Sequence, residues 1–223
     1  MGEFRKWGGI SALIEAAAYI FGFGMVLAVL VPAGYEPVDF DPGEAVAFLA
    51  DNQTAMYVWT FVIFIIAGVF MVPLSLALHE RLKAGSRALM QTATAFGLMW
   101  ATLIVASGML IIIDLGVIGD LFAKDPGQAE TVWLSLNAVE EALGGGIELP
   151  GGMWVLLLSW AALRAGGLPK GLNYLGVLVG AAGILTVFPV LAEVLTSAFG
   201  LGFIVWFAWA GIVMLRDHQA QEA

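Results

Sequence analysis

The sequence has no cysteine and only two histidines among its 223 residues. The lack of cysteine excludes disulfide bonds, thiolate metal sites and cysteine nucleophiles. His79 and His218 both fall on the predicted cytoplasmic side, so a histidine-rich zinc site within the membrane is also excluded. No Gly-x-Ser-x-Gly element is present, and Ser159 has no histidine near it in the sequence. We therefore predict neither a metal site nor a cofactor.

Basic residues are scarce as well. Nine Lys and Arg stand against 18 Asp and Glu, which gives a net charge of -9. Nine basic residues spread over several loops cannot form the basic face that phosphate binding needs, so nucleic acid is excluded as a partner. Charged residues make up only 12% of the chain, where soluble proteins have roughly a quarter.

Hydrophobic residues are abundant instead, at 61% of the chain, and the mean hydropathy is +0.92. No charged or Pro/Ser-rich linker divides the sequence, so we expect one domain over residues 1–223. We predict an all-α fold, a polytopic membrane bundle of about six transmembrane helices, with the lipid bilayer as its surroundings. The expected segments are 8–31, 55–78, 89–117, 133–163, 171–195 and 199–215, with a very tight connection at 197–202.

The distribution of charge predicts the orientation. The loops on one side of the six segments carry eight of the nine basic residues, and only Lys124 falls on the other side. The positive-inside rule then places both termini in the cytoplasm. The opposite side receives two acidic loops, and the first of them contains a short amphipathic helix predicted over residues 44–50. The basic residues counted as cytoplasmic are Arg5, Lys6, Arg81, Lys83, Arg87, Arg164, Lys170 and Arg216.

The fourth segment contains residues that a lipid-facing helix does not favour. Glycine and proline weaken a helix, and Glu148 is a carboxylate at membrane depth. As a straight helix, residues 133–163 would measure about 46 Å, longer than a hydrocarbon core of about 30 Å. The segment is therefore strongly tilted, begins at the interface or breaks, whereas close helix packing is the alternative use of its glycines. The predicted helix-break residues are Gly144, Gly145, Gly146, Pro150, Gly151 and Gly152.

Polar residues along these segments predict a binding site. Asn137, Glu141 and Glu148 share one face of the fourth segment at helical spacing. The other candidates are Asp114 on the third segment and Thr186 and Glu193 on the fifth. Intramembrane acids are candidates for a cation site, a proton relay or the lining of a cavity. The alternative is structural: Asp114, Glu140 and Glu193 reach interfacial water, and Glu15 and Glu148 hold helices together.

The sequence from Glu148 to Trp154, the loop that ends Leu168-Pro169-Lys170, and the closing Trp206-Phe207-Ala208-Trp209 carry a resemblance. In these stretches the chain is similar to the bacterial multi-span membrane proteins of domain-of-unknown-function family 4386. The resemblance implies a six-helix protein of the bacterial cytoplasmic membrane. It carries over no catalytic residue, because that family has no established activity.

Three functions remain open from the sequence. The first is a small transporter, channel or ligand-binding membrane protein that holds a small molecule or a cation on its intramembrane carboxylates. The second is an accessory subunit whose glycine-rich faces pack against a homo-oligomer or a membrane-protein partner. The third, an enzyme acting on lipid, needs a nucleophile or a metal, and the sequence offers only carboxylates. We expect a binding protein rather than an enzyme.

Overall fold

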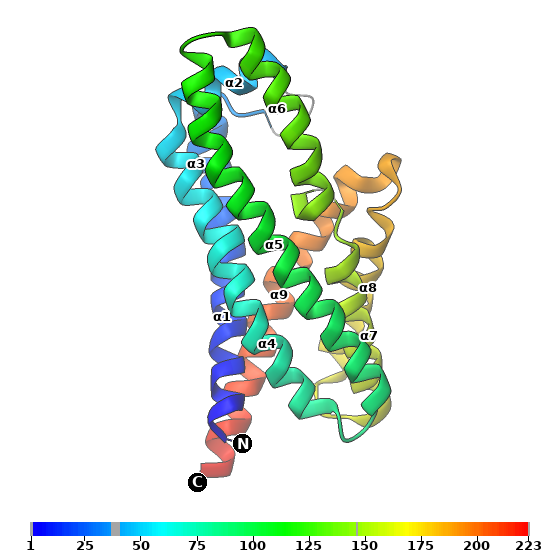
Figure 1. Cartoon of the computed structure of the whole chain (residues 1–223). Helices are drawn as coiled ribbons and strands as arrows, with labels where there is room; N and C mark the ends of the chain where they lie inside the picture. Colours follow the sequence, from blue (N-terminus) through cyan, green and yellow to red (C-terminus); the bar gives the residue numbers. More distant parts are fainter. Residues whose placement is uncertain (1, 37–40, 146, 223) are drawn as a thin grey trace.

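The computed structural model describes residues 2–36, 41–145 and 147–222, and these residues form helices and no strand. Figure 1 shows them as a bundle of long helices with both termini at one end. The elements are α1 (Gly2–Met25), η1 (Val26–Leu30), η2 (Val31–Ala33), α2 (Pro42–Asp51), α3 (Gln53–Thr60), η3 (Phe61–Ile66), α4 (Ala67–Leu82), α5 (Arg87–Phe122), α6 (Pro126–Glu140), η4 (Glu141–Gly145), α7 (Leu149–Ala165), α8 (Lys170–Leu185) and α9 (Pro189–Glu222).

The chain passes along the bundle six times. Five helical stretches in the described part of the chain are long and apolar enough to cross a membrane. They are Lys6–Ala33, Gln53–Leu82, Arg87–Phe122, Pro126–Ala165 and Pro189–Arg216. The sixth pass is α8, which is apolar but has only 16 residues. At 1.5 Å per residue it measures about 24 Å, slightly less than a hydrocarbon core. The predicted all-α membrane bundle is confirmed.

The half of the bundle that carries the termini is a closed ring. Each helix packs on two neighbours, in the order α1, α4, α5, α7, α8, α9 and back to α1. Buried aromatic side chains fill the centre of this ring. Phe203 lies 4.5 Å from Phe207 and 5.2 Å from Trp100, measured between ring centroids. Trp154 and Trp206, both fully buried, pack edge to face at 5.4 Å. Such aromatic contacts bury large apolar areas and stabilise the ring.

Glycines allow the ring to close. A Cβ atom on Gly152 would stand 2.7 Å from the backbone nitrogen of Ile184 and 2.8 Å from the carbonyl oxygen of Gly180. A Cβ on Gly151 would stand 2.6 Å from the Trp100 ring. These glycines therefore bring α7 against α8 and against α5. Small residues have this use in membrane bundles, where helix backbones must approach closely.

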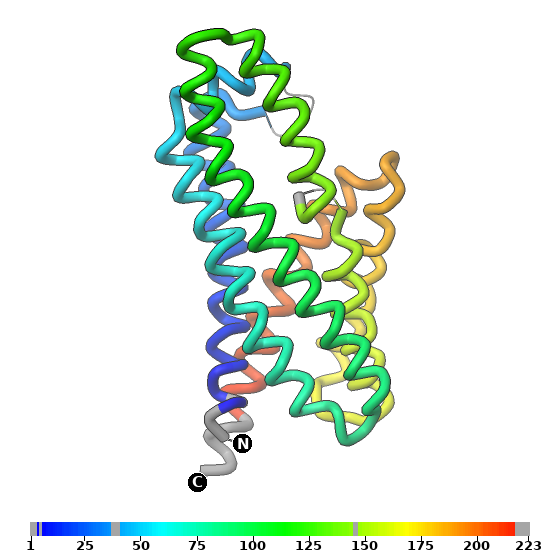
Figure 2. The backbone as a smooth tube through the Cα atoms, viewed as in Figure 1, coloured from blue at the N-terminus to red at the C-terminus, as the bar shows by residue number. Residues whose placement is uncertain are grey.

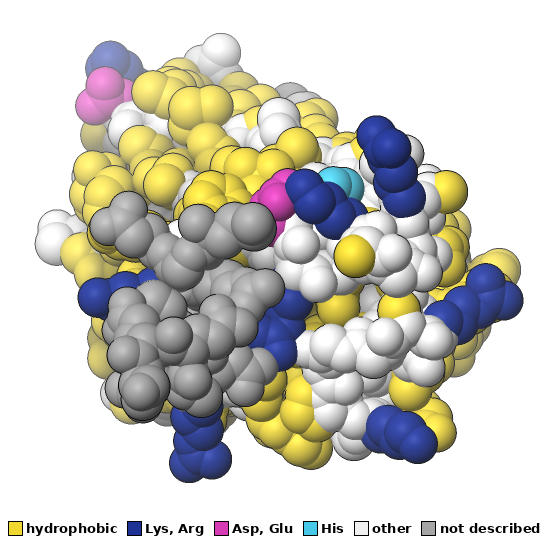
Figure 3. Space-filling model, turned by 90° about the horizontal axis from the view of Figure 1, so that it is seen from below, with side chains coloured by type: hydrophobic (Ala, Val, Ile, Leu, Met, Phe, Trp, Pro, Cys, Tyr) yellow, Lys and Arg dark blue, Asp and Glu magenta, His cyan; other side chains and the backbone are white. Residues whose placement is uncertain are grey.

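The outer surface suits a lipid environment. Large apolar side chains are exposed on several helices, among them Leu27, Ile113, Leu178 and Val194. Figure 3 views the end that carries the termini, where Lys and Arg are the main charged side chains. The other end holds α2, which Asp41 caps by accepting hydrogen bonds from the amides of Gly43 at 3.0 Å and Glu44 at 3.2 Å. The short helix predicted there is confirmed.

The predicted boundary between the fifth and sixth segments is wrong. The turn lies at residues 186–188, and α9 runs without interruption through the expected connection at 197–202. Figure 2 shows α9 leaving this turn and crossing the bundle toward the end with the termini. Proline suits the first turn of a helix, where its missing N–H is not needed, so Pro189 begins α9. Gly200 and Gly202 are packing positions, since Cβ atoms there would meet Phe23 and Val179.

Candidate functional site

A cavity of about 680 Å³ occupies the half of the bundle away from the termini. This volume is within the usual range for small-molecule sites. It arises because α6 packs on α5 and α2 and does not continue the ring formed by the other helices. Its wall is largely apolar and aromatic, with Tyr19, Trp59, Phe64, Trp100, Trp133 and Phe199 among the lining residues. Five carboxylic acids also line it: Glu36, Asp114, Glu140, Glu141 and Glu148.

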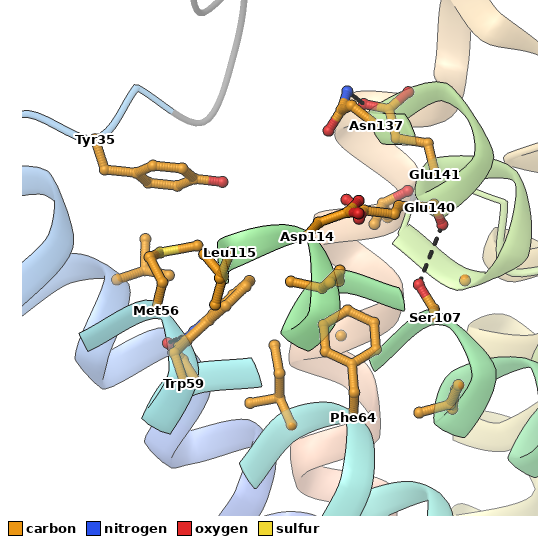
Figure 4. A pocket seen from close by; sticks show the side chains of 18 of the residues that line it. Tyr35, Met56, Trp59, Phe64, Ser107, Asp114, Leu115, Asn137, Glu140 and Glu141 are labelled. Atoms are coloured by element: carbon orange, nitrogen blue, oxygen red, sulfur yellow. Dashed lines mark hydrogen bonds between the residues drawn. The ribbon is translucent and has the colours of Figure 1, made fainter. Parts of the chain in front are cut away.

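Asp114 of α5 and Glu140 of α6 form a carboxyl pair in the cavity wall. Their carboxyl groups lie close enough to be hydrogen-bond partners, and Figure 4 shows the two side chains directed at each other. Asp114 is only 6% exposed. The Ser107 hydroxyl donates a hydrogen bond to the backbone oxygen of Glu140 at 3.3 Å, which fixes the end of α6 against α5. Because an ionised carboxylate can only accept, a hydrogen bond between the two acids requires one shared proton.

Glu141 and Asn137 lie next to this pair, at the end of α6. The Asn137 amide donates to the Glu141 carboxylate at 3.4 Å, across one helical turn. Tyr35, which follows η2, faces them from the other side of the cavity, as Figure 4 shows. Burial and the negative charge of Glu141 raise the pKa of Tyr35. The phenol is therefore protonated at neutral pH and presents a hydroxyl group to the cavity. Glu36 and Glu141 are exposed, so the cavity opens to the surface there.

The fourth segment breaks, and Glu148 is at the break. The helical chain that begins as α6 ends with η4 at Gly145, and α7 starts at Leu149 with Glu148 as its N-cap residue. The Thr186 hydroxyl accepts a hydrogen bond from the Glu148 amide at 2.9 Å and donates one to the Gly183 carbonyl at 2.7 Å. Both Thr186 and Glu148 are buried, at 1% and 9% exposure. Thr186 thus ties the start of α7 to the last turn of α8.

The floor of the cavity contains an unused hydrogen-bond donor. Trp100 is only 2% exposed and its indole N–H has no hydrogen-bond partner, although the Glu148 carboxyl group is a near neighbour. Both residues line the cavity. Buried polar groups in proteins are normally satisfied, and an unsatisfied one needs an explanation such as a ligand. The nearby Glu148 carboxyl group is an acceptor for this donor, so the two side chains together form a polar patch on the cavity floor.

The break is narrower than the sequence predicted. Gly144 and Gly145 belong to η4, and Gly146 lies outside the described residues. Pro150, Gly151 and Gly152 are in the first turns of α7 and continue the helix. Proline is tolerated there because the first-turn amides have no partner in the helix. Of the three arrangements considered for the long segment, the structure has the broken one.

The structure brings four of the predicted polar residues together and places two elsewhere. Asp114, Asn137, Glu141 and Glu148 all line the cavity. Thr186 does not line it but orders the break through its two hydrogen bonds. Glu193 is exposed in the first part of α9 and does not reach the cavity. Both residues were predicted on one helical segment, and the turn at residues 186–188 places Thr186 after α8 and Glu193 on α9.

Sequence reasoning missed other lining residues. Glu140 was assigned only to interfacial water, although its position beside Glu141 puts two acids where the fourth segment breaks. Tyr35 and Trp59 carried no sequence signal, because an aromatic residue near a helix end is equally typical of the membrane interface. Only the packing of α3 and of the chain after η2 around the cavity distinguishes them.

The carboxyl pair lies toward the end of its spans that is away from the termini. Asp114 is 27 positions beyond Arg87, the first residue of α5, which corresponds to about 40 Å of helix. A hydrocarbon core is about 30 Å thick, so an upright α5 would carry Asp114 past it, and a tilt would lower it toward the interface. Among the described residues that line the cavity there is no Lys, Arg or His, and the local field is therefore negative.

Comparison with known families identifies the chain. The family model described as "Domain of unknown function (DUF4386)" matches residues 8–215. The protein belongs to this family. The match spans the six passes, the break and the residues that line the cavity. No curated protein and no solved structure matches the chain.

Proposed function

We propose that this DUF4386 protein is a ligand-binding membrane protein, a transporter, channel or sensor whose site is the acidic cavity. It resides in the bacterial cytoplasmic membrane, and its cavity opens on the outer side. The orientation is supported by the basic residues at the end that carries the termini. The single observation that carries the proposal is the convergence of acids from α5, α6, η4 and the start of α7 on one cavity.

The broken helix supports the same proposal. Discontinuous helices in membrane proteins occur where unwound backbone is buried in protein or lines a cavity. Here Gly144 of η4 and Glu148 at the start of α7 both line the cavity. Thr186 satisfies the Glu148 amide, so the break is ordered by specific hydrogen bonds. A bundle that only needed to pack would not require this interruption. The family match itself supports a membrane protein and assigns no activity.

The test is a thermal-shift screen of the purified protein against cations, lipids and small metabolites. A ligand that binds only the folded state should stabilise the protein by about 2.7 kcal/mol at 100 times its dissociation constant. We expect a shift in the wild type that is lost in Glu148→Gln. Glu193→Gln is the matched control, because Glu193 is exposed and does not line the cavity.

Two results would contradict the proposal. Equal shifts in the wild type and in Glu148→Gln would place the ligand outside the cavity. The absence of any shift, together with co-purification of a second membrane protein, would favour the accessory-subunit function instead.

A further inference from the structure

The carboxyl pair of Asp114 and Glu140 restricts the charge of the ligand. Figure 4 shows the carboxyl groups of Asp114 and Glu140 directed at each other in the cavity wall, and two carboxyl groups in contact favour the state that holds one proton between them, with a net charge of about -1. Two ionised groups at that separation would repel each other strongly in a poorly solvated site. The pair therefore loses its shared proton and becomes two carboxylates only when a cation enters and takes the place of that proton.

The rest of the cavity restricts the shape and polarity of that cation. Aromatic side chains from four elements line it, including Tyr19, Trp59, Trp100 and Trp133. Aromatic rings attract cations through their faces and offer an apolar surface to the remainder of the ligand. A small hydrated metal ion would leave most of this surface unused, whereas a bulky organic cation would cover it.

We infer that the cavity binds a hydrophobic organic monocation, and that binding releases the proton shared by Asp114 and Glu140. This inference rests on the proposed function and specifies its ligand class. The exchange balances: the protonated pair and the cation give two carboxylates, the bound cation and one proton released to water. The net charge of the site stays the same through the exchange, so no additional charge is buried.

The other titratable groups around the cavity leave the direction of the pH dependence unchanged. They are Tyr19 of α1, Tyr35 and Glu36 after η2, Glu141 of η4 and Glu148 at the start of α7. All are acidic groups, and α2, α3 and α9 contribute no titratable residue to the described lining. Protonation therefore only competes with a cation. Where one proton is released per ligand, affinity rises about tenfold for each pH unit.

The experiment uses tetraphenylphosphonium as the probe, measured by titration calorimetry with purified wild-type protein. Titrations in phosphate and in Tris, which have different heats of ionisation, give the number of protons released. We expect about one proton per bound tetraphenylphosphonium. Triphenylphosphine oxide is the neutral comparison and tetraphenylborate the anionic one. Both should bind at least about tenfold more weakly, the factor for a difference of about 1.4 kcal/mol.

Two variants locate the released proton. Asp114→Asn and Glu140→Gln each remove one partner of the pair, and each should abolish proton release and weaken cation binding. Using both guards against one of them failing to fold. Glu193→Gln should behave like the wild type.

The outcomes separate this inference from the proposed function. Binding of tetraphenylphosphonium without proton release, or equal binding of the neutral analogue, overturns the inference while the cavity remains a ligand site. Absence of tetraphenylphosphonium binding also overturns it, even if the thermal-shift screen finds another ligand at Glu148. If neither experiment shows a ligand, both proposals fail.

Discussion

The two halves of this bundle are built from the same six passes but differ in how they are packed. In the half with the termini, six helices close into a ring around buried aromatic side chains. In the other half, α6 packs on α5 and α2 and does not continue the ring. A cavity of about 680 Å³ takes the place of the aromatic core there. The break between η4 and α7 is where one arrangement changes into the other.

The comparison shows two uses for glycine in one short stretch. Gly151 and Gly152 remove side chains so that α7 can touch its neighbours, which closes the ring. Gly144 and Gly145 end the helical chain, which opens the cavity. Close packing therefore explains Gly151 and Gly152, and the helix-break prediction explains Gly144 and Gly145. A run of glycines can thus mark the border between a structural half and a binding half.

Cysteine labelling tests whether one half of the bundle is open and the other closed, because a thiol is either labelled or left unlabelled. The sequence has no cysteine, so Asn137→Cys and Ser159→Cys would each place a single thiol. Asn137 lines the cavity, whereas Ser159 is fully buried in the ring. We expect a membrane-impermeant maleimide, applied to intact cells, to label Asn137→Cys and to leave Ser159→Cys unlabelled.

Two further variants control the orientation. Lys124→Cys should react from outside, and Arg164→Cys should react only after the membrane is permeabilised, because the positive-inside rule places them on opposite sides. Labelling of Ser159→Cys at the rate of Asn137→Cys would mean that the ring half is not closed. The reverse pattern at Lys124 and Arg164 would invert the orientation.

Gly152→Val tests the closed half through stability. The added Cβ would stand 2.7 to 2.9 Å from backbone atoms of Ile184, Gly180 and Gly183, which cannot rotate away. Overpacking of this kind costs about 3 kcal/mol. Gly116→Val is the matched control, since nothing lies within 4 Å of a Cβ on Gly116. Thermal unfolding in detergent should show a clear loss for the first variant and little change for the second. Equal stability of the two would contradict the close contact between α7 and α8.

The ring half could be anticipated from sequence in its broad features. Segment lengths and the charge asymmetry predicted six helical passes with the termini together, and the structure has them. The boundary between the last two passes could not be predicted. Pro189 reads equally well as an interruption inside a helix or as the first residue of one. What decides is the packing of Gly200 and Gly202 against Phe23 and Val179, which are distant in sequence.

The cavity could be anticipated only in part. Helical spacing connected Asn137, Glu141 and Glu148, and an acid within an apolar segment identified Asp114. Glu193 is also an acid within an apolar segment, but it does not line the cavity. The helix expected over residues 171–195 ends at Leu185 in the structure, so Glu193 belongs to α9. The pairing of Asp114 with Glu140 depends on how α6 crosses α5, and sequence spacing within one helix carries no information on that crossing.

Thr186→Val tests the break between η4 and α7, where the two halves meet. Of the variants discussed, it should have the smallest effect on stability. The substitution keeps the shape of the side chain but removes the hydroxyl that accepts from the Glu148 amide and donates to the Gly183 carbonyl. A buried donor left without a partner costs about 1 kcal/mol or more. We expect a modest loss in the free energy of unfolding and faster hydrogen exchange at the Glu148 amide.

Thr186→Ser keeps the hydroxyl and is the matched control, so its hydrogen exchange at Glu148 should stay near the wild-type rate. The exchange measurement is the decisive one, because a purely local loss of packing would lower stability without selecting that amide. If Thr186→Val protects the Glu148 amide as well as the wild type does, the bond to α8 does not hold the break. The cavity would then depend on the contact between α5 and α6 alone, and Ser107, whose hydroxyl bonds the end of α6, would be the residue that keeps it open.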